Sequence, residues 1–360
     1  TPPIPLKGDQ GVKGAIHAVL THGQFINGPQ VDQFARSLEH YLGAKHVIPC
    51  ANGTDALQIA MMALGLKPGD EVIVPAFTYI APAEVMALLG LQIVWADVDA
   101  NTFNIKPESI IASITPKTKA IVAVHLFGQC ADMDAIMDIA VKHQLYVIED
   151  NAQSLGSKYT FKDGKTVSAG CIGHIGTTSF FPSKNLACCG DGGAIMTQDD
   201  ELAQRIKMIA NHGQSQKYHH EVVGVNSRLD TIQAAILEVK LPHLDENNQK
   251  RAQIAAVYDE VLKDVPYIEI PQRTSSSTHV FHQYTIKVKD GRRDEVQAKL
   301  EAQGIQTRIY YPMALHQQRV FAHMEAKSLP VAEALCREVL SLPIGPEMDE
   351  IKSLFKGFKW

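Results

Sequence analysis

Short apolar runs alternate with longer amphipathic stretches through the first two thirds of the chain. The short runs predict buried strands, because each is bounded by polar or Gly- and Pro-containing segments, and they lie at residues 46–49, 71–74, 91–96, 120–124 and 145–148. Between them, residues 54–64, 81–89, 107–114 and 132–143 carry apolar positions at helical spacing, and Asn104 and Asp132 are the expected N-caps of the last two helices. This alternation predicts an α/β fold with a parallel sheet.

The pattern changes after Asp150. Two further strands are predicted at 177–181 and 194–197, and the polar, Gly-rich loop 182–193 between them suits a functional site. Residues 230–262 form a charged helical stretch broken at Pro242, followed by a predicted strand at 281–288 and helices at 294–303 and 330–340. We therefore expect a large α/β domain at 1–242, and a linking helix with a small C-terminal α+β domain at 243–360.

Composition narrows the class of protein. The 360 residues are 45% hydrophobic and carry a net charge of −5 with a pI near 6.3, which allows a large core and lacks the basic excess that nucleic-acid binding needs. No run approaches the roughly 20 apolar residues that cross a bilayer, so we expect a soluble protein. The six cysteines show no regular framework, which favours reduced thiols in the cytoplasm.

Two segments at the ends of predicted strands carry polar groups suited to a ligand. In Cys50-Ala-Asn-Gly-Thr-Asp55 the chain opens a helix, so the amides near Gly53 and Thr54 could bind a phosphate, or the segment could be an ordinary capped helix start. The second segment ends a buried strand with Glu149 and Asp150. Neighbouring strand residues point to opposite faces, so these carboxylates are not expected to act as a pair. A carboxylate facing a cleft here could stabilise a protonated ring nitrogen or a metal, or cap a loop.

Lys184 and Arg228 are the candidate functional cations. Lys184 follows the apolar run Ser179-Phe-Phe-Pro182, which would desolvate the ammonium, lower its pKa and make the amine a nucleophile toward an aldehyde. The alternative is a surface lysine in a turn. Arg228 could bind a carboxylate or phosphate through its forked guanidinium, or form a salt bridge at a helix start.

Together these segments resemble the PLP-dependent sugar aminotransferases of the DegT/StrS family, which have the fold-type-I, aspartate aminotransferase-like fold. The resemblance covers nearly the whole chain. It rests on Asn52-Gly-Thr-Asp-Ala-Leu57, Pro75-Ala-Phe-Thr-Tyr79, Ile148-Glu-Asp-Asn-Ala-Gln153, Ser179-Phe-Phe-Pro-Ser-Lys184, Gly190-Asp-Gly-Gly193 and Asn226-Ser-Arg228. It implies an enzyme that transfers the amino group of L-glutamate to a keto group of a nucleotide-linked sugar, in two half-reactions.

The resemblance also implies roles for residues around the cofactor ring. Lys184 would hold pyridoxal 5′-phosphate (PLP) as a Schiff base and then act as the general base, and Asp150 would pair with the pyridine nitrogen. Phe77 matches the position that stacks on the ring, and Gln153 matches the one near its 3-hydroxyl.

For the cofactor phosphate, the resemblance implies ligands from two chains. Gly53, Thr54 and Ser179 would bind it from one subunit, and Asn226 would reach in from a neighbour. A homodimer with composite active sites is therefore expected.

The substrate is implied by finer similarities. Several stretches are closest to the branch that aminates UDP-2-acetamido-2-deoxy-3-oxo-glucuronate for O-antigen polysaccharide, in which the residue matching Arg228 binds the sugar carboxylate. The family's usual His-Tyr-Pro is here Tyr310-Tyr311-Pro312, so a phenol replaces an imidazole and a neutral 3-keto or 4-keto sugar becomes a rival. His316 is a further candidate for contact with the substrate.

Three other classes compete with this prediction. A dehydratase offshoot of the family has a histidine where this chain has Lys184. A non-catalytic, PLP-binding regulatory protein would share the same binding residues. A zinc protein would need ligands from Cys188, Cys189, His212, His219 and His220, whose spacing lacks the usual paired motifs.

Overall fold

The computed structural model describes residues 11–324 and 327–348, and its centre is a seven-stranded sheet. The strand order is β1-β9-β8-β5-β4-β2-β3, and β9 runs antiparallel to both of its neighbours while the other pairs are parallel. The strands are β1 (His46–Cys50), β2 (Glu71–Pro75), β3 (Gln92–Ala96), β4 (Thr118–Val124), β5 (Tyr146–Asp150), β8 (Ile175–Ser179) and β9 (Gly193–Thr197). The predicted α/β class with a large, mostly parallel mixed sheet is confirmed.

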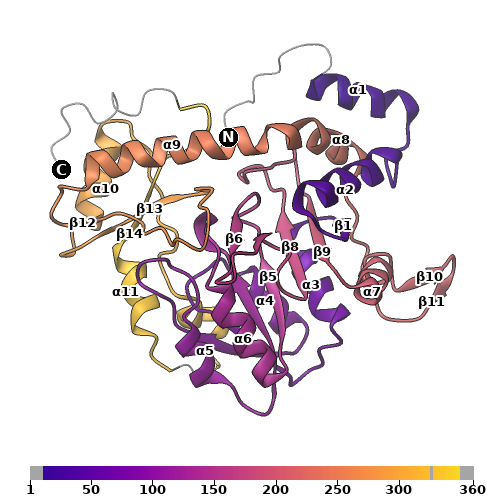
Figure 1. Cartoon of the computed structure of the whole chain (residues 1–360), viewed down its shortest axis with the longest axis horizontal. Helices are drawn as coiled ribbons and strands as arrows, with labels where there is room; N and C mark the ends of the chain where they lie inside the picture. Colours follow the sequence, from indigo (N-terminus) through magenta and orange to yellow (C-terminus); the bar gives the residue numbers. More distant parts are fainter. Residues whose placement is uncertain (1–10, 325–326, 349–360) are drawn as a thin grey trace.

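Helices cover both faces of this sheet (Figure 1). Helices α3 (Gly53–Ala63), α4 (Ala81–Leu88) and α7 (Asp200–Ala210) share one core with Val72 and Val74 of β2. Helices α5 (Pro107–Ser113) and α6 (Met133–His143) pack on the other face, where Ile73 points. On that second face α2 (Pro29–Leu42) and α8 (Thr231–Lys240) cover the edge formed by β1 and β9. The apolar runs of the strands follow from this burial on two sides.

The two predicted helix caps have different outcomes. Asp132 caps α6, because its Oδ1 accepts the Ala135 amide at 3.2 Å, as predicted. The prediction for Asn104 is wrong, since α5 is preceded by Lys106. Asn104 is buried, accepts the Leu126 amide at 3.0 Å and donates to Cys130 O at 3.1 Å, so it fixes the loop after β4 instead.

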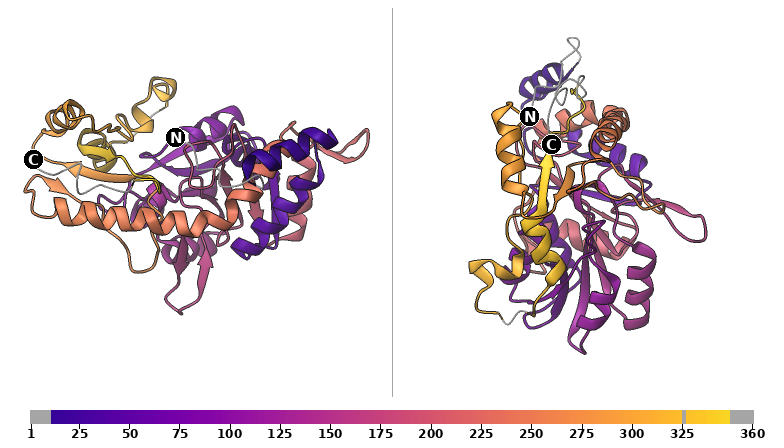
Figure 2. Two further views of the ribbon diagram at one scale, coloured as in Figure 1. Left: turned by 90° about the horizontal axis from the view of Figure 1, so that it is seen from above. Right: turned by 90° about the vertical axis from the view of Figure 1, so that its left-hand side faces the viewer.

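The C-terminal part has its own three-stranded antiparallel sheet of β12 (Ile268–Glu269), β13 (Tyr284–Val288) and β14 (Val339–Leu342). The 3-10 turn η2 (Leu241–His243), which contains Pro242, leads from α8 into α9 (Leu244–Leu262). Figure 2 shows α9 running along both parts of the molecule. Its last turns share a core with the small sheet and with α10 (Arg293–Ala302). Helix α11 (Pro330–Glu338) instead packs against the core of the large sheet, so the two parts share a close interface.

Some elements differ from the sequence prediction. The helix expected at 330–340 ends at Glu338, because the following apolar residues pair with β13 as strand β14. The strand expected at 281–288 begins only at Tyr284. Several elements have no prediction. They are the helices α1 (Val12–His22), α2 and α7, the strand β12, the hairpin β6 (Lys158–Thr160) with β7 (Thr166–Ser168), the hairpin β10 (Gln214–Gln216) with β11 (His219–His220), and the short turns η1 (Leu126–Gly128), η3 (Leu315–Gln317) and η4 (Arg319–Phe321). Hairpin β10–β11 projects from the body of the molecule (Figure 1). Within the described ranges, no helix is long and apolar enough to cross a bilayer.

Candidate active site

A cavity of about 680 Å³ opens at the carboxyl ends of the central strands, where open α/β sheets bind ligands. Its walls are the start of α3, the loops that follow β2, β5 and β8, and two segments of the C-terminal part. It brings together eight of the predicted site residues, namely Gly53, Thr54, Asp150, Gln153, Ser179, Lys184, Tyr310 and Tyr311.

The start of α3 forms an anion cradle at one end of this cavity. Asn52 caps the helix through its Oδ1, which accepts the Asp55 amide at 2.8 Å. The amides of Gly53 and Thr54 lie in the first helical turn, where no intrahelical acceptor exists. A Cβ on Gly53 would lie 2.7 Å from Ser179 Cβ, so only glycine permits this close approach to the end of β8. Free amides and hydroxyls at a helix N-terminus suit a phosphate.

Asp150 ends β5 and faces the cavity, with 8% of its surface exposed. Its Oδ1 accepts the Ala152 amide at 3.0 Å, and its Oδ2 has no hydrogen-bond partner within the described part of the chain. Burial raises the pKa of the Asp150 carboxyl, against the opposing effects of the Ala152 amide and of Lys184. The carboxylate therefore has acceptor capacity left for a cationic group bound in the cavity.

Glu149, its neighbour, points to the other side of the sheet and is fully buried. His125 Nε2 lies 2.8 Å from its Oε2, and the amides of Gly170, Ile172 and Gly173 donate to it at 2.8, 2.6 and 2.6 Å. The two carboxylates are thus separated by the strand, as expected, and Glu149 is occupied with internal partners.

Lys184 lies in a tight turn, in which its amide donates to Phe181 O at 2.8 Å. Its half-buried side chain lines the cavity, and its Nζ makes no hydrogen bond or ion pair with any described residue. Burial lowers the pKa of the Lys184 ammonium to about 8, although Asp150 raises it. A substantial fraction of this amine is therefore neutral near physiological pH, as a nucleophile toward an aldehyde requires.

Gln153 and Tyr311 form the wall beside Asp150. Gln153 Oε1 accepts the Phe127 amide at 2.9 Å, and Nε2 lies 3.1 Å from the Tyr311 hydroxyl, to which it donates. Burial raises the pKa of Tyr311, so the phenol stays protonated. Tyr310 lines the same wall.

Of the two aromatic residues in the segment 75–79, Phe77 does not line the cavity and Tyr79 does. Phe77 is 1% exposed and packs against Phe103, Phe127 and Tyr311, outside the cavity lining. Tyr79, two residues later in the same motif, is 57% exposed and lines the cavity. The motif was recognised, but the order of its aromatic residues alone does not say which side chain turns outward.

Several further polar residues of the cavity had no predicted role, and Asp191, His282 and Gln283 are among them. Asp191 belongs to the Gly-rich loop that was recognised as a motif. His282 and Gln283 come from the C-terminal part, just before β13. In the sequence, His282 and Gln283 are recognisable only as a polar pair directly before an apolar strand. Nothing in the sequence indicates that this pair lies near Lys184.

Besides Phe77, three predicted residues lie outside the cavity lining. Asn226 is exposed and pairs with Asn211 in an isolated β-bridge, and Arg228 is half-buried. His316 is buried, with Nε2 lying 3.2 Å from Glu333 Oε1. One chain alone does not bring these side chains to the reaction cavity.

A zinc site finds no support in the geometry. Residues 11–324 and 327–348 contain no group of three or more His, Cys, Asp or Glu side chains suited to a metal ion. Cys188 is buried, which raises its pKa to about 12, and Cys189 is exposed. His219 and His220 lie on the projecting hairpin β10–β11. All six cysteines are free.

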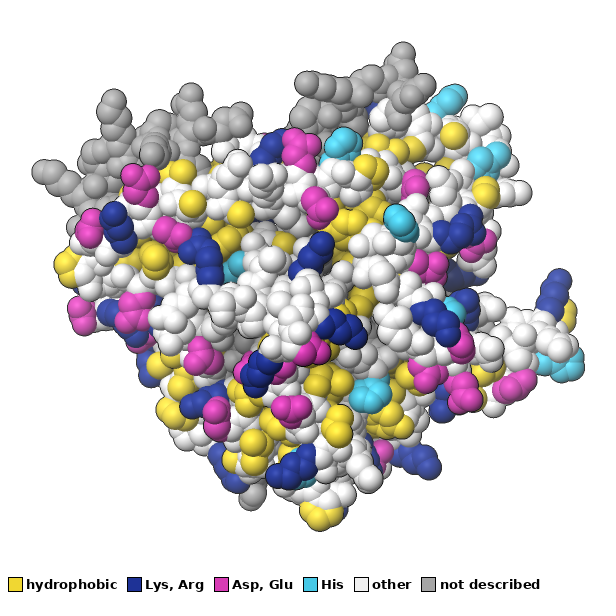
Figure 3. Space-filling view, in the orientation of Figure 1, with side chains coloured by type: hydrophobic (Ala, Val, Ile, Leu, Met, Phe, Trp, Pro, Cys, Tyr) yellow, Lys and Arg dark blue, Asp and Glu magenta, His cyan; other side chains and the backbone are white. Residues whose placement is uncertain are grey.

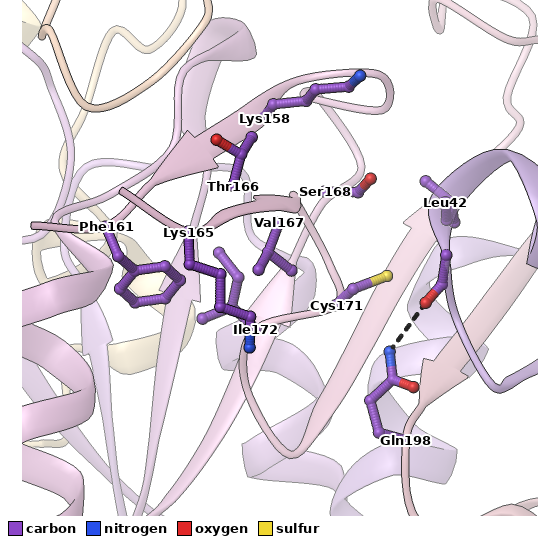
Figure 4. A pocket seen from close by; sticks show the side chains of 11 residues that line it. Leu42, Lys158, Phe161, Lys165, Thr166, Val167, Ser168, Cys171, Ile172 and Gln198 are labelled. Carbon is purple, nitrogen blue, oxygen red and sulfur yellow. Dashed lines mark hydrogen bonds between the residues drawn. The ribbon is translucent and has the colours of Figure 1, made fainter. Parts of the chain in front are cut away.

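A second cavity of about 550 Å³ lies beside hairpin β6–β7 (Figure 4). Lys158, Lys165, Cys171 and Gln198 are among its lining residues, and Gln198 Nε2 donates to Gly43 O at 3.4 Å. Burial raises the pKa of the Cys171 thiol to about 12, so this cavity lacks an activated nucleophile there. On the face shown in Figure 3, basic and acidic side chains of the described residues are interspersed.

The larger cavity fits PLP on three observations. It combines an anion cradle built around Gly53, an unpaired amine with a lowered pKa at Lys184, and a carboxylate with free acceptor capacity at Asp150. Fold and site together define a PLP-dependent enzyme of fold type I. The chain belongs to the DegT/DnrJ/EryC1/StrS aminotransferase family, which it matches over residues 7–353. This confirms the predicted family, enzyme class and cofactor.

Similar proteins agree in length as well as in sequence. The UDP-2-acetamido-2-deoxy-3-oxo-D-glucuronate aminotransferase of Pseudomonas aeruginosa is 49% identical, with 96% of this chain and 95% of that protein covered. The UDP-N-acetyl-3-dehydro-alpha-D-glucosamine 3-aminotransferase of Acidithiobacillus ferrooxidans is 46% identical, with 93% and 89% covered. Among solved structures, NtdA from Bacillus subtilis with bound cofactor PMP superposes with a TM-score of 0.88 at 35% identity, covering 98% of this chain and 82% of that one.

Proposed function

We propose that this aminotransferase transfers the amino group of L-glutamate to the 3-keto group of a UDP-linked 2-acetamido sugar, and that the sugar is a hexuronate. The observation that carries the proposal is that Lys184 and Asp150 line one cavity with a phosphate cradle, in a chain 49% identical to an enzyme named for that substrate. The product, an amino sugar, would serve polysaccharide synthesis.

The residues of the cavity have separate roles toward the cofactor. PLP, when bound, supplies an electrophilic aldehyde and an electron sink. Gly53, Thr54 and Ser179 would hold its phosphate, and Tyr79, which lines the cavity where Phe77 does not, would cover its ring. Asp150 would keep the proton on the ring nitrogen.

Lys184 would be the general base that moves the proton of the glutamate α carbon. Its amine would take the proton from the α carbon of glutamate and deliver it to the cofactor, which would supply the electron sink. The lowered pKa makes the amine a competent base near neutral pH. In the second half-reaction Lys184 would move a proton in the opposite direction, to the carbon that carried the keto group of the sugar.

One observation bears on the uronate. Lys184 is the sole lysine or arginine among the described residues that line the cavity, so one chain offers no spare cation for a sugar carboxylate. We propose that the partner subunit's Arg228 supplies it and that the partner subunit's Asn226 reaches the cofactor phosphate, in a homodimer. The same scarcity of cations favours a neutral 3-keto sugar as the second candidate.

The first experiment establishes the half-reaction. Purified protein is mixed with L-glutamate, and absorbance follows conversion of the cofactor from its aldehyde to its amine form. Lys184→Ala should abolish conversion while keeping the far-UV circular dichroism spectrum. A wild-type spectrum unchanged by glutamate would instead support a PLP-binding regulatory protein.

The second experiment addresses the sugar. A panel of UDP-linked 3-keto and 4-keto sugars is offered with glutamate, and mass spectrometry detects each amino sugar. Arg228→Ala should raise the KM for a uronate by about tenfold and leave that for a neutral sugar nearly unchanged. Equal effects on both would remove the carboxylate role of Arg228.

A further inference from the structure

His282 and Asn185 form a polar chain beside Lys184 that the scheme above does not use. His282 is 6% exposed and lines the cavity, and its Nδ1 lies 3.2 Å from Asn185 Oδ1. Asn185 directly follows Lys184 in the sequence. The contact between His282 and Asn185 therefore links the loop of the reactive lysine to the C-terminal part of the molecule.

The hydrogen bonds of Asn185 fix which ring nitrogen of His282 carries the proton. Asn185 Nδ2 donates to Asn248 Oδ1 at 2.7 Å and to Val280 O at 3.1 Å, so both of its hydrogens are used. Asn248 is itself oriented, because its Nδ2 donates to Leu155 O at 3.2 Å. Asn185 therefore presents its oxygen to His282, and an amide oxygen only accepts. The imidazole proton must lie on Nδ1, which leaves a lone pair on Nε2.

The surroundings keep this imidazole neutral. Burial lowers the pKa of His282 well below its usual value, and the positive charges of Lys184 and then Arg251 lower it further. Arg251 is held in place, since its Nη1 donates to Ile344 O at 3.0 Å. Lys184 and His282 line the same cavity without a hydrogen bond between them, and His282 Nε2 has no hydrogen-bond partner among the described residues.

We propose that His282 Nε2 is the hydrogen-bond acceptor for the Lys184 amine once substrate has displaced that amine from the bound cofactor, and that Asn185 is the positioning residue that fixes the imidazole tautomer. This inference rests on the proposed transamination. The lysine stem is flexible, so its amine needs a partner to hold it near the reacting carbons. A carboxylate there would stabilise the ammonium and retain the proton, whereas a neutral acceptor orients the amine and lets the proton leave. His282 neither gains nor loses a proton in this scheme.

Protein loaded with pyridoxamine 5′-phosphate, in which the Lys184 amine is not attached to the cofactor, tests the contact directly. The pH dependence of Lys184 acetylation, measured by peptide mass spectrometry, gives the pKa of its amine, with exposed Lys119 as an internal reference for the reagent. His282→Asn keeps an amide near Asn185 but leaves no group at the position of Nε2, whereas His282→Gln extends an acceptor to it. His282→Asn should lower the pKa of Lys184 by about one unit, and His282→Gln should restore most of the shift. An unchanged Lys184 pKa in His282→Asn would overturn the proposal.

Nitrogen NMR tests the tautomer. In protein labelled with ¹⁵N-histidine, the His282 resonances, recognised by their loss in His282→Gln, should show a protonated Nδ1 and an unprotonated Nε2. Asn185→Leu should yield a mixture of tautomers. A proton on Nε2 in the wild-type protein contradicts the inference.

Single-turnover kinetics connect the contact to the reaction. With L-glutamate, His282→Asn should slow the first-order conversion by about tenfold at unchanged glutamate affinity, and α-deuterated glutamate should show a larger isotope effect than in the wild type. Wild-type rates in His282→Asn would refute the inference alone. A protein that passes the acetylation and NMR tests but never converts glutamate would refute the proposed function alone.

Discussion

Glu149 and Asp150 are adjacent carboxylates at the end of β5, yet their surroundings differ completely. On one side of the sheet, Glu149 is enclosed by His125 and three backbone amides. On the other side, Asp150 has the single amide of Ala152 and borders the cavity. Strand β5 therefore separates two sides of the sheet. On the closed side every Glu149 oxygen has a hydrogen-bond donor, and on the open side Asp150 has acceptor capacity left and borders the cavity.

This difference shows how partners decide the use of a buried charge. A buried carboxylate with every oxygen engaged stabilises the particular fold that supplies its donors. A buried carboxylate with unused acceptor capacity is costly unless a ligand completes it. Glu149 thus stabilises the fold, and Asp150 can accept a hydrogen bond from the cofactor.

Replacing Asp150 should produce the largest effect on the reaction. Asp150→Asn keeps the size and the acceptor for the Ala152 amide but removes the charge opposite the ring. We expect conversion with L-glutamate to slow by about 10²- to 10³-fold at nearly unchanged thermal stability. Stopped-flow absorbance and a melting curve measure the two. A rate close to that of the wild type would show that the open carboxylate is not the ring partner.

Replacing Glu149 should have the opposite pattern of effects, with a large loss of stability and a small change in the reaction rate. Glu149→Gln leaves an amide among groups that all donate to a carboxylate, and we expect a loss of about 3 kcal/mol of unfolding free energy. Conversion by the folded fraction should stay within about threefold of the wild type. Urea denaturation with a parallel single-turnover assay measures both. A large loss of rate without a loss of stability would remove the distinction between the two sides.

The same division explains what could be predicted from the sequence. The strands of the large sheet and helices α3, α4, α5 and α6 follow from apolar periodicity, because the burial of the strands on two faces leaves a strong pattern. Asp150 and Lys184 were identifiable from local motifs beside such strands. His282 and Tyr79 were not, since one reaches the cavity from a part more than ninety residues away in sequence and the other differs from Phe77 only in the direction of its side chain. Asn104 failed as a predicted cap because a buried loop, formed by residues further along the chain, uses its amide.

Two glycines, Gly53 in the cavity that Asp150 borders and Gly170 beside Glu149, allow the same comparison of the two sides of β5, with smaller expected effects. Gly53→Ala would push Ser179, whose Cβ would lie 2.7 Å from the new methyl group, and should weaken PLP binding by about tenfold. Gly170→Ala, on the closed side at a φ of +84°, should instead cost about 1–2 kcal/mol of stability. Cofactor titration and thermal melting of both variants separate the effects. If Gly53→Ala affects only stability, α3 does not hold the phosphate.

The smallest expected effect concerns pH and the coupling of Lys184 to the open side. Covalent attachment of PLP requires the neutral amine, so the rate of cofactor uptake should rise with pH and level off above about 8, where the pKa of Lys184 lies. Asp150 raises that pKa, so Asp150→Asn should move the midpoint to lower pH, whereas Glu149→Gln should leave it in place. The PLP-free protein should also become more stable between pH 8 and 10.5, because in that window the unfolded chain still binds a proton that the folded Lys184 has released. Lys184→Met should abolish this rise in stability. Equal midpoints in the wild type and Asp150→Asn would show that the open carboxylate does not act on the lysine.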